Sequence, residues 1–149
     1  MVTMDTDREE VLQDALEYLK HQNTGFLATH GRAGLRVSPV SIFLNNEMGI
    51  FLHCFGGEKL INLSENPEAC LLVIEDKWSL DPGFYEGVQV FGEVKEIKSD
   101  SDLYGRVEEW CPYTHQDKMT LLELLPQKLN VVDYPDGEKR KRSLELAKQ

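Results

Sequence analysis

The amino-acid sequence predicts a mainly β protein, built as a Greek-key-like antiparallel barrel with flanking helices. Two observations predict this fold. Roughly six or seven strand-like runs stand against three helical patterns, and most strands follow one another without an intervening helix. A chain of 149 residues with 41% apolar residues is long enough to bury a real core. We therefore expect a single domain over residues 1–149 rather than a parallel α/β sheet.

The first predicted element is an amphipathic helix at about residues 7–21. Thr6 and Glu9 have the spacing of a capping box, and the motif NTG ends the helical pattern. The apolar residues that recur on one face of this helix are Val11, Leu12, Ala15, Leu16 and Leu19.

From about residue 24 the apolar residues recur with a period of two, which is typical of strands. The runs FLATH, LRVSPVSIFL and IFLHCF, separated by the turns GRAG and NNEMG, predict a three-stranded meander. Pro39 lies inside the second run and has no N–H to donate. We expect a bulge or a strand edge there, which would leave backbone groups free to face a ligand.

The middle of the chain predicts two helices and two strands. A short helix, EKLINLSE, follows two glycines and is closed by Asn66 and Pro67. The run ACLLVIE predicts a buried strand, DKWSLDPGF a loop, and YEGVQVFGEVKEI a long strand that bends at Gly92. The segment SDSDLYGRVEEW predicts a helix that ends before Pro112.

The last third predicts two short strands and a tail. Pro126 separates MTLLELL from KLNVVDY, so we expect two strands that complete a barrel over about residues 24–134. The charged segment at about 135–149 predicts a frayed or helical surface tail.

The composition narrows the classes of molecule that this protein is expected to bind. A formal net charge of −10 disfavours nucleic acid and anionic membranes, which need positive potential, and favours small molecules or proteins as partners. The acidic N-terminus and the lack of a long apolar run predict a cytoplasmic protein. Three cysteines without a CxxC pair predict neither a disulfide framework nor a metal site.

Lys59 suggests where a ligand binds. It lies in the first turn of the helix after Gly56 and Gly57, where free N–H groups and a partial positive charge favour an anion. Arg36 lies on a strand that the meander could bring alongside, so the two cations could hold a phosphate. The alternative is that both are solvated surface residues, and Glu58 places a negative charge beside the supposed site.

The succession RVSPVSIFL, GIFLHCFGGEKLINLSENPEACLLVIED and YEGVQVFGEVKEI resembles the pyridoxamine 5′-phosphate oxidase-like proteins with an FMN-binding split barrel. Within that superfamily, LHCFGGEKL is most similar to the branch containing the nitroimidazole-resistance proteins. The resemblance covers about residues 11–134. It implies a split β-barrel with flanking helices, and a homodimer with FMN in clefts formed by both subunits.

The resemblance also implies a set of site residues. Arg36 and Lys59 match the basic residues that reach the FMN phosphate. His53, a candidate catalytic residue, matches a position beside the flavin and would supply a hydrogen bond or proton near the reacting edge. The other residues that match positions lining the flavin are Val37, Ser38, Pro39, Val40, Ser41 and Leu52.

Other positions depart from the family pattern. Gly57 and Glu58 stand where relatives often carry Ser and Arg, which leaves open the loss of one or two phosphate contacts. Gly87 stands where the vitamin B6 oxidases have a glutamine supplied by the other subunit, which implies that the chain is not a true vitamin B6 oxidase.

The resulting expectation is an FMN-dependent oxidoreductase that acts on an unknown small molecule, with NADPH or NADH as a possible electron donor. FAD, a deazaflavin or haem could replace FMN. The alternatives are a non-catalytic flavin or haem carrier or sensor, and a dimeric scaffold without a ligand.

Overall fold

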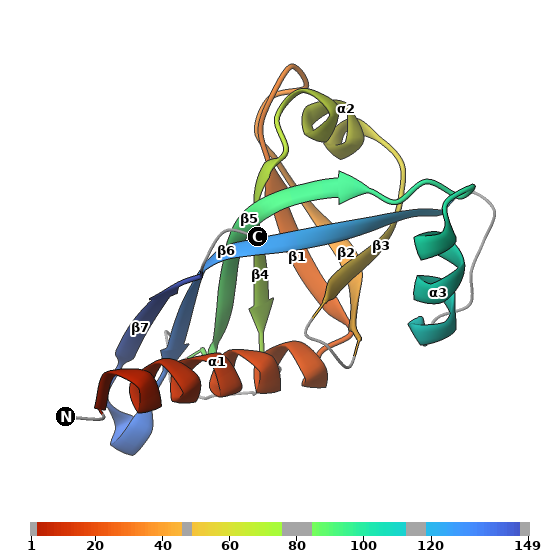
Figure 1. The fold of residues 1–149 in the computed structure, drawn as a ribbon. Coiled ribbons are helices and arrows are strands. Elements are labelled where there is room, and N and C mark those ends of the chain that lie inside the picture. Colours follow the sequence, from red (N-terminus) through yellow and green to blue (C-terminus); the bar gives the residue numbers. More distant parts are fainter. Residues whose placement is uncertain (1–2, 46–48, 76–84, 113–118, 147–149) are drawn as a thin grey trace.

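The computed structural model describes residues 3–45, 49–75, 85–112 and 119–146, and Figure 1 shows the fold. The predicted loop DKWSLDPGF lies outside the described residues. The elements, in chain order, are α1 (Thr3–His21), β1 (Thr24–Thr29), β2 (Arg36–Leu44), β3 (Ile50–Phe55), α2 (Glu58–Glu65), β4 (Glu68–Ile74), β5 (Gly87–Glu96), α3 (Asp102–Trp110), β6 (Met119–Asp133), the 3-10 turn η1 (Pro135–Gly137) and β7 (Arg140–Glu145).

The strands form an antiparallel sheet in the order β3-β2-β1-β4-β5-β6-β7. An additional pairing between β3 and β6 closes β1 to β6 into a six-stranded barrel. The predicted mainly β split barrel with flanking helices is therefore confirmed. Within the described residues, no helix is long and apolar enough to span a membrane.

The barrel interior and the inner face of α1 share one hydrophobic core. Strand side chains alternate between the two faces of the sheet, so every second residue points inward. Inward-facing leucines and valines, among them Leu27, Leu52, Leu71, Val90 and Leu122, are almost fully buried. Val11, Ala15 and Leu19 of α1 belong to the same cluster. The helix runs across one end of the barrel, and α2 lies at the opposite end (Figure 1).

A second, smaller cluster lies between the barrel and α3. Phe51 of β3 stacks on Phe43 of β2, with ring centroids 5.6 Å apart. Val107 of α3, with no exposed surface, and Leu121 of β6 pack in the same cluster. Because β3 contributes to both clusters, its two faces are both buried.

Strand β6 differs from the prediction of two short strands. It runs without interruption from Met119 to Asp133 and contains Pro126. Pro126 pairs with Gly92 at a register shift between β5 and β6, and a Cβ at Gly92 would lie 2.1 Å from Leu125 O. The proline is tolerated because it lies at this irregularity, where the ladder is already disrupted.

The C-terminal segment also differs from the prediction of a frayed or helical tail. It forms β7, which pairs with β6 from Lys128 to Asp133 and places Leu144 in the core at 5% exposure. The paired strand buries its single leucine, and Arg140 and Arg142 on the same face are only partly exposed. At the other end of the chain, α1 begins at Thr3, four residues earlier than predicted.

Candidate functional site

The candidate site begins at an open edge of β2. Strand β2 pairs with β1 over residues 36–41 but with β3 only from Ser41 to Leu44. Pro39 lies two residues before the end of the β3 ladder, and it has no N–H to donate to one. The predicted strand edge is therefore present. The predicted bulge is not, because the β1–β2 register continues through Pro39 without a shift.

Helix α2 starts near this edge with the predicted Gly-Gly turn. Gly57 has φ of 129°, a conformation that glycine adopts readily and other residues rarely adopt. It is the N-cap of α2 and makes no side-chain capping bond, so no cap side chain satisfies the N–H groups of the first turn.

The structure brings Arg36 and Lys59 to this same helix start. The Arg36 guanidinium forms an ion pair with the Glu58 carboxylate, and its Nε donates to Ala33 O at 3.3 Å. Lys59 follows Glu58, and its Nζ donates to Gly56 O at 3.5 Å. Two cations that are 23 positions apart in the sequence thus lie at one helix terminus, together with one carboxylate.

Asn62 fixes this arrangement, and sequence reasoning missed it. Its side chain has no exposed surface. The Nδ2 group donates to Thr29 Oγ1 at 3.2 Å and to Gly34 O at 2.8 Å, and Oδ1 accepts from Ala33 N at 2.9 Å. One amide therefore ties α2 to both sides of the β1–β2 turn, which is the turn that leads into Arg36.

Two exposed contacts add to this attachment. Asn66 Nδ2 lies 2.8 Å from His30 Nε2, and Arg32 pairs with Glu65 at 3.3 Å. Gly31 is also required, because a Cβ there would lie 2.9 Å from Asn62 Oδ1. The β1–β2 turn and α2 are thus linked along the length of the helix.

The other predicted residues of β2 differ in exposure. Val37 is 72% exposed and Val40 is buried at 3%. Pro39 is exposed, and Ser38 and Ser41 are partly buried. All except Ser41 lie in the part of the strand that is not paired with β3.

The two predicted residues of β3 are both buried. Leu52 has no exposed surface and belongs to the barrel core. His53 is 1% exposed and lies on the opposite face, level with Ser41 and Leu121, where Cys111 Sγ is 4.0 Å from its Nδ1. The next residue, Cys54, is again in the core, where burial raises the pKa of its thiol.

The outer face of the sheet beside the open edge is apolar. Phe26 lies opposite both Pro39 and Leu72, and residues directly opposite one another share a face. We call the surface formed by Phe26, Val37, Pro39, Leu72 and Ile74 the apolar face. Phe26 is 40% exposed. A surface of this kind is typical of an interaction site.

A pocket of about 230 Å³ continues the apolar face over β5 and β6. Leu72 and Ile74 contribute to its lining, together with Tyr85, Gly87, Val88, Gln89, Asn130, Val132, Lys139 and Lys141. Asn130 Nδ2 lies 3.4 Å from Gln89 Oε1 and its Oδ1 accepts from Ser143 Oγ at 2.7 Å. Close packing explains why position 87 is a glycine, because a Cβ there would lie 2.3 Å from Val73 O.

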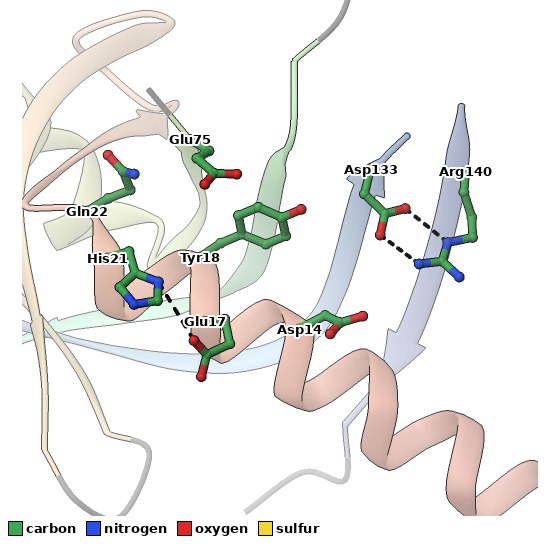
Figure 2. Close-up of a pocket in the computed structure, with 8 residues that line it drawn as sticks. All are labelled: Asp14, Glu17, Tyr18, His21, Gln22, Glu75, Asp133 and Arg140. Carbon is green, nitrogen blue, oxygen red and sulfur yellow. Dashed lines mark hydrogen bonds and ion pairs between the residues drawn. The ribbon is translucent and has the colours of Figure 1, made fainter. Parts of the chain in front are cut away.

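A larger pocket, of about 380 Å³, lies beside α1 (Figure 2). It is lined by Asp14, Glu17, Tyr18, His21, Gln22, Glu75, Asp133 and Arg140. Burial and the bond from its hydroxyl to Glu86 raise the pKa of Tyr18. Four of the eight lining residues are acidic and one, Arg140, is basic, so the net negative charge would repel a phosphate. Within the described residues, no group of three or more His, Cys, Asp or Glu side chains could hold a metal ion.

Together these features define a small split-barrel protein with two cations beside an open strand edge. The chain belongs to the family described as Pyridoxamine 5′-phosphate oxidase, whose model matches residues 11–133. The predicted resemblance to this family is confirmed, while the nitroimidazole-resistance branch stays a prediction. No curated protein matches the sequence.

Solved structures show the same fold. HutZ, the haem storage protein from Vibrio cholerae, has a TM-score of 0.65 at 23% identity, over 80% of this chain and 92% of that chain. A protein from Clostridium acetobutylicum related to general stress protein 26 has a TM-score of 0.67 at 13% identity, over 93% and 96%. An FAD-binding protein from Mesorhizobium loti has a TM-score of 0.59 at 15% identity, over 79% and 89%.

Proposed function

We propose that this protein is an FMN-binding flavoprotein that acts as an FMN-dependent oxidoreductase on a small molecule. The observation that carries the proposal is the meeting of Arg36 and Lys59 at the first turn of α2, beside a strand edge not paired with β3. Charge-assisted hydrogen bonds from such a pair suit a phosphate group. The family relationship supports the same assignment.

In this proposal the chain's own residues bind and orient the cofactor. Arg36 and Lys59 neutralise the phosphate, and the backbone and side chains of residues 37–41 line the flavin. Leu52 supports the site from the barrel core. His53 is 1% exposed beside Cys111, so its proposed hydrogen bond or proton to the reacting edge requires that α3 moves away from it. When bound, FMN supplies electron or hydride transfer at its ring, and the protein sets its orientation and potential. NADH or NADPH is the proposed electron donor.

We further propose that the active form is a homodimer. The apolar face beside the open edge of β2 exposes Phe26 and Val37 to water in a single chain. A second copy that covers this face would enclose the cofactor at the seam between subunits, where ligand sites often lie.

Haem is the second candidate ligand. One observation favours it: a solved structure with the same fold is a haem storage protein. In that case the protein would be a carrier or sensor rather than an oxidoreductase.

Reconstitution separates these candidates. The purified protein is titrated with FMN, riboflavin, FAD and haem, and binding is followed by flavin absorption and fluorescence or by the Soret band. We expect FMN to bind and to be reduced by NADH or NADPH with turnover. A Soret complex with no flavin binding would favour the carrier, and no binding of any of the four would contradict the cofactor-binding proposal.

Lys59→Ala tests the phosphate assignment. Loss of one charge-assisted contact costs about 1.5–3 kcal/mol, which is roughly a tenfold to hundredfold weakening of FMN binding. Riboflavin has the same ring without the phosphate and should be affected far less. Equal weakening of both ligands, or no change in either, would mean that Lys59 is an ordinary surface lysine.

A further inference from the structure

The Arg36–Glu58 ion pair joins the two elements that hold the candidate site. Arg36 begins β2 and Glu58 begins α2, and their side chains are 45% and 53% exposed. Ion pairs at this exposure contribute little to stability, so the fold does not depend on this pair. The Arg36 side chain is also held by Ala33 O, a contact that does not require Glu58.

The negative charge of Glu58 therefore has its main effect on what binds there. The helix start carries two cations, Arg36 and Lys59, and one of them is already paired with a carboxylate of the same chain. A carboxylate and a phosphate compete for the same guanidinium donors. Each presents two oxygens at the spacing of the paired N–H groups of Arg. A ligand phosphate must either displace Glu58 or bind close to its charge.

We propose that Glu58 is a built-in competitor for the anionic group of the ligand, and that it makes the site discriminate weakly between phosphorylated and unphosphorylated flavin. This inference rests on the proposed function and concerns the ligand selectivity of the same site. Glu58 occupies Arg36 in the empty protein and lowers the affinity for a dianion, while an uncharged ligand such as riboflavin loses nothing. The Glu58 carboxylate thus acts as an internal counter-ion for Arg36. Without it, the site would strongly prefer a phosphorylated ligand over an unphosphorylated one.

The helix also offers a matched control. Glu65 lies at the other end of α2 and pairs with Arg32 of the same β1–β2 turn. Glu65→Gln removes the same charge from the same helix and breaks the same type of pair, but away from Arg36 and Lys59.

The test is a titration of FMN and riboflavin into wild type, Glu58→Gln and Glu65→Gln. We expect Glu58→Gln to bind FMN about fivefold to fiftyfold more tightly, because a unit charge a few ångströms from a dianion is removed. Riboflavin affinity should change by less than about twofold, and Glu65→Gln should change neither ligand by more than about twofold. The FMN affinity of Glu58→Gln should also fall more steeply with added salt than that of wild type.

The outcomes separate the inference from the proposed function. FMN binding of equal strength in wild type and Glu58→Gln would overturn the inference and leave the proposed function intact. Equal tightening of FMN and riboflavin would overturn it as well, since the effect would then not concern the phosphate. If neither flavin binds to any of the three proteins, the proposed function fails and the inference fails with it. FMN binding by Glu58→Gln but not by wild type would support the inference and contradict the proposed function, since the natural chain would then not hold FMN.

Discussion

Asn62 is the residue on which the geometry of the candidate site depends most. It is fully buried and makes three hydrogen bonds to the β1–β2 turn from a single amide. A net contribution of about 1 kcal/mol per bond, together with the cost of leaving their partners unsatisfied, makes this a strong local attachment. The relative position of Arg36 and the start of α2 follows from it.

We predict that Asn62→Ala destabilises the protein by about 1–3 kcal/mol, because it removes three hydrogen bonds and leaves the buried Thr29 hydroxyl without its partner. Urea unfolding measures this free energy. Ser64→Ala is the control, because Ser64 is exposed on the same helix and its hydroxyl donates to Ile61 O of the same helix. A loss of less than about 0.5 kcal/mol for Asn62→Ala would contradict the role of this residue as the attachment.

Asn62 also shows why part of the site could not be predicted from the sequence. In the run EKLINLSE, Ile61 and Asn62 are adjacent, and composition alone would bury the isoleucine. The structure does the reverse, with Ile61 39% exposed and Asn62 fully buried. A buried asparagine is favourable only because the turn presents backbone groups to it, and that turn comes from a distant part of the chain. Lys59 could be placed at a helix start because helix-start chemistry is a local signal, whereas Arg36 beside it depended on the predicted meander.

At the scale of elements, local pattern predicted most of the barrel. Strong periodicity and clear stop signals predicted α2 at Glu58–Glu65 and the end of α3 before Pro112. Both predictions agree with the structure. The two differences at the C-terminal end depend on pairing partners rather than on local sequence. Pro126 is accommodated only because Gly92 lies opposite it, and β7 exists only because β6 offers an edge.

Strand β7 is held by ion pairs as well as by Leu144. Arg140 donates two hydrogen bonds to Asp133, at 2.9 and 2.7 Å, and Arg142 pairs with both Asp133 and Asp14. The bond from Arg140 is the main reason why the pKa of Asp133 is lowered, although burial opposes it. The ionised carboxylate therefore stabilises the folded state.

We predict that Asp133→Asn costs about 1–3 kcal/mol of folding free energy at pH 7. Because the folded pKa of Asp133 is lowered, its contribution is complete above the unfolded pKa, about 3.9, and is lost as the pH falls through the folded value. The difference between variant and wild type should therefore shrink in strong acid. Urea unfolding at pH 7 and in acid measures it.

Asp100→Asn is the control for this prediction, since Asp100 is exposed in the turn before α3. A stability difference for Asp133→Asn that does not depend on pH would show that the loss comes from packing rather than from the charge. No difference at pH 7 would mean that β7 detaches freely in solution.

At the scale of the whole molecule, the apolar face leads to a prediction about assembly. We expect light scattering to give twice the chain mass of 17.1 kDa. Phe26→Glu should shift the protein toward monomer, because it places a charge in the centre of a dehydrated contact. A monodisperse monomer at micromolar concentration that still binds FMN would contradict the two-subunit site.

Ile61→Glu is the matched control for assembly. Ile61 is 39% exposed, close to the 40% of Phe26, but it lies on α2 rather than on the apolar face. If both variants dissociate the dimer equally, the effect is not specific to the sheet. If only Ile61→Glu dissociates it, the interface must be placed at the α2 end.

The position of β6 in the barrel has a consequence for how the protein is made. Strand β6 pairs with β3, β5 and β7, and it is the element that closes the ring. Until residues 119–133 have left the ribosome, the nascent sheet β3-β2-β1-β4-β5 has two unpaired edges, and exposed edges pair with other chains. Barrel closure therefore waits for nearly the last segment to be synthesised, and premature termination before β6 should yield products that aggregate rather than shorter folded proteins.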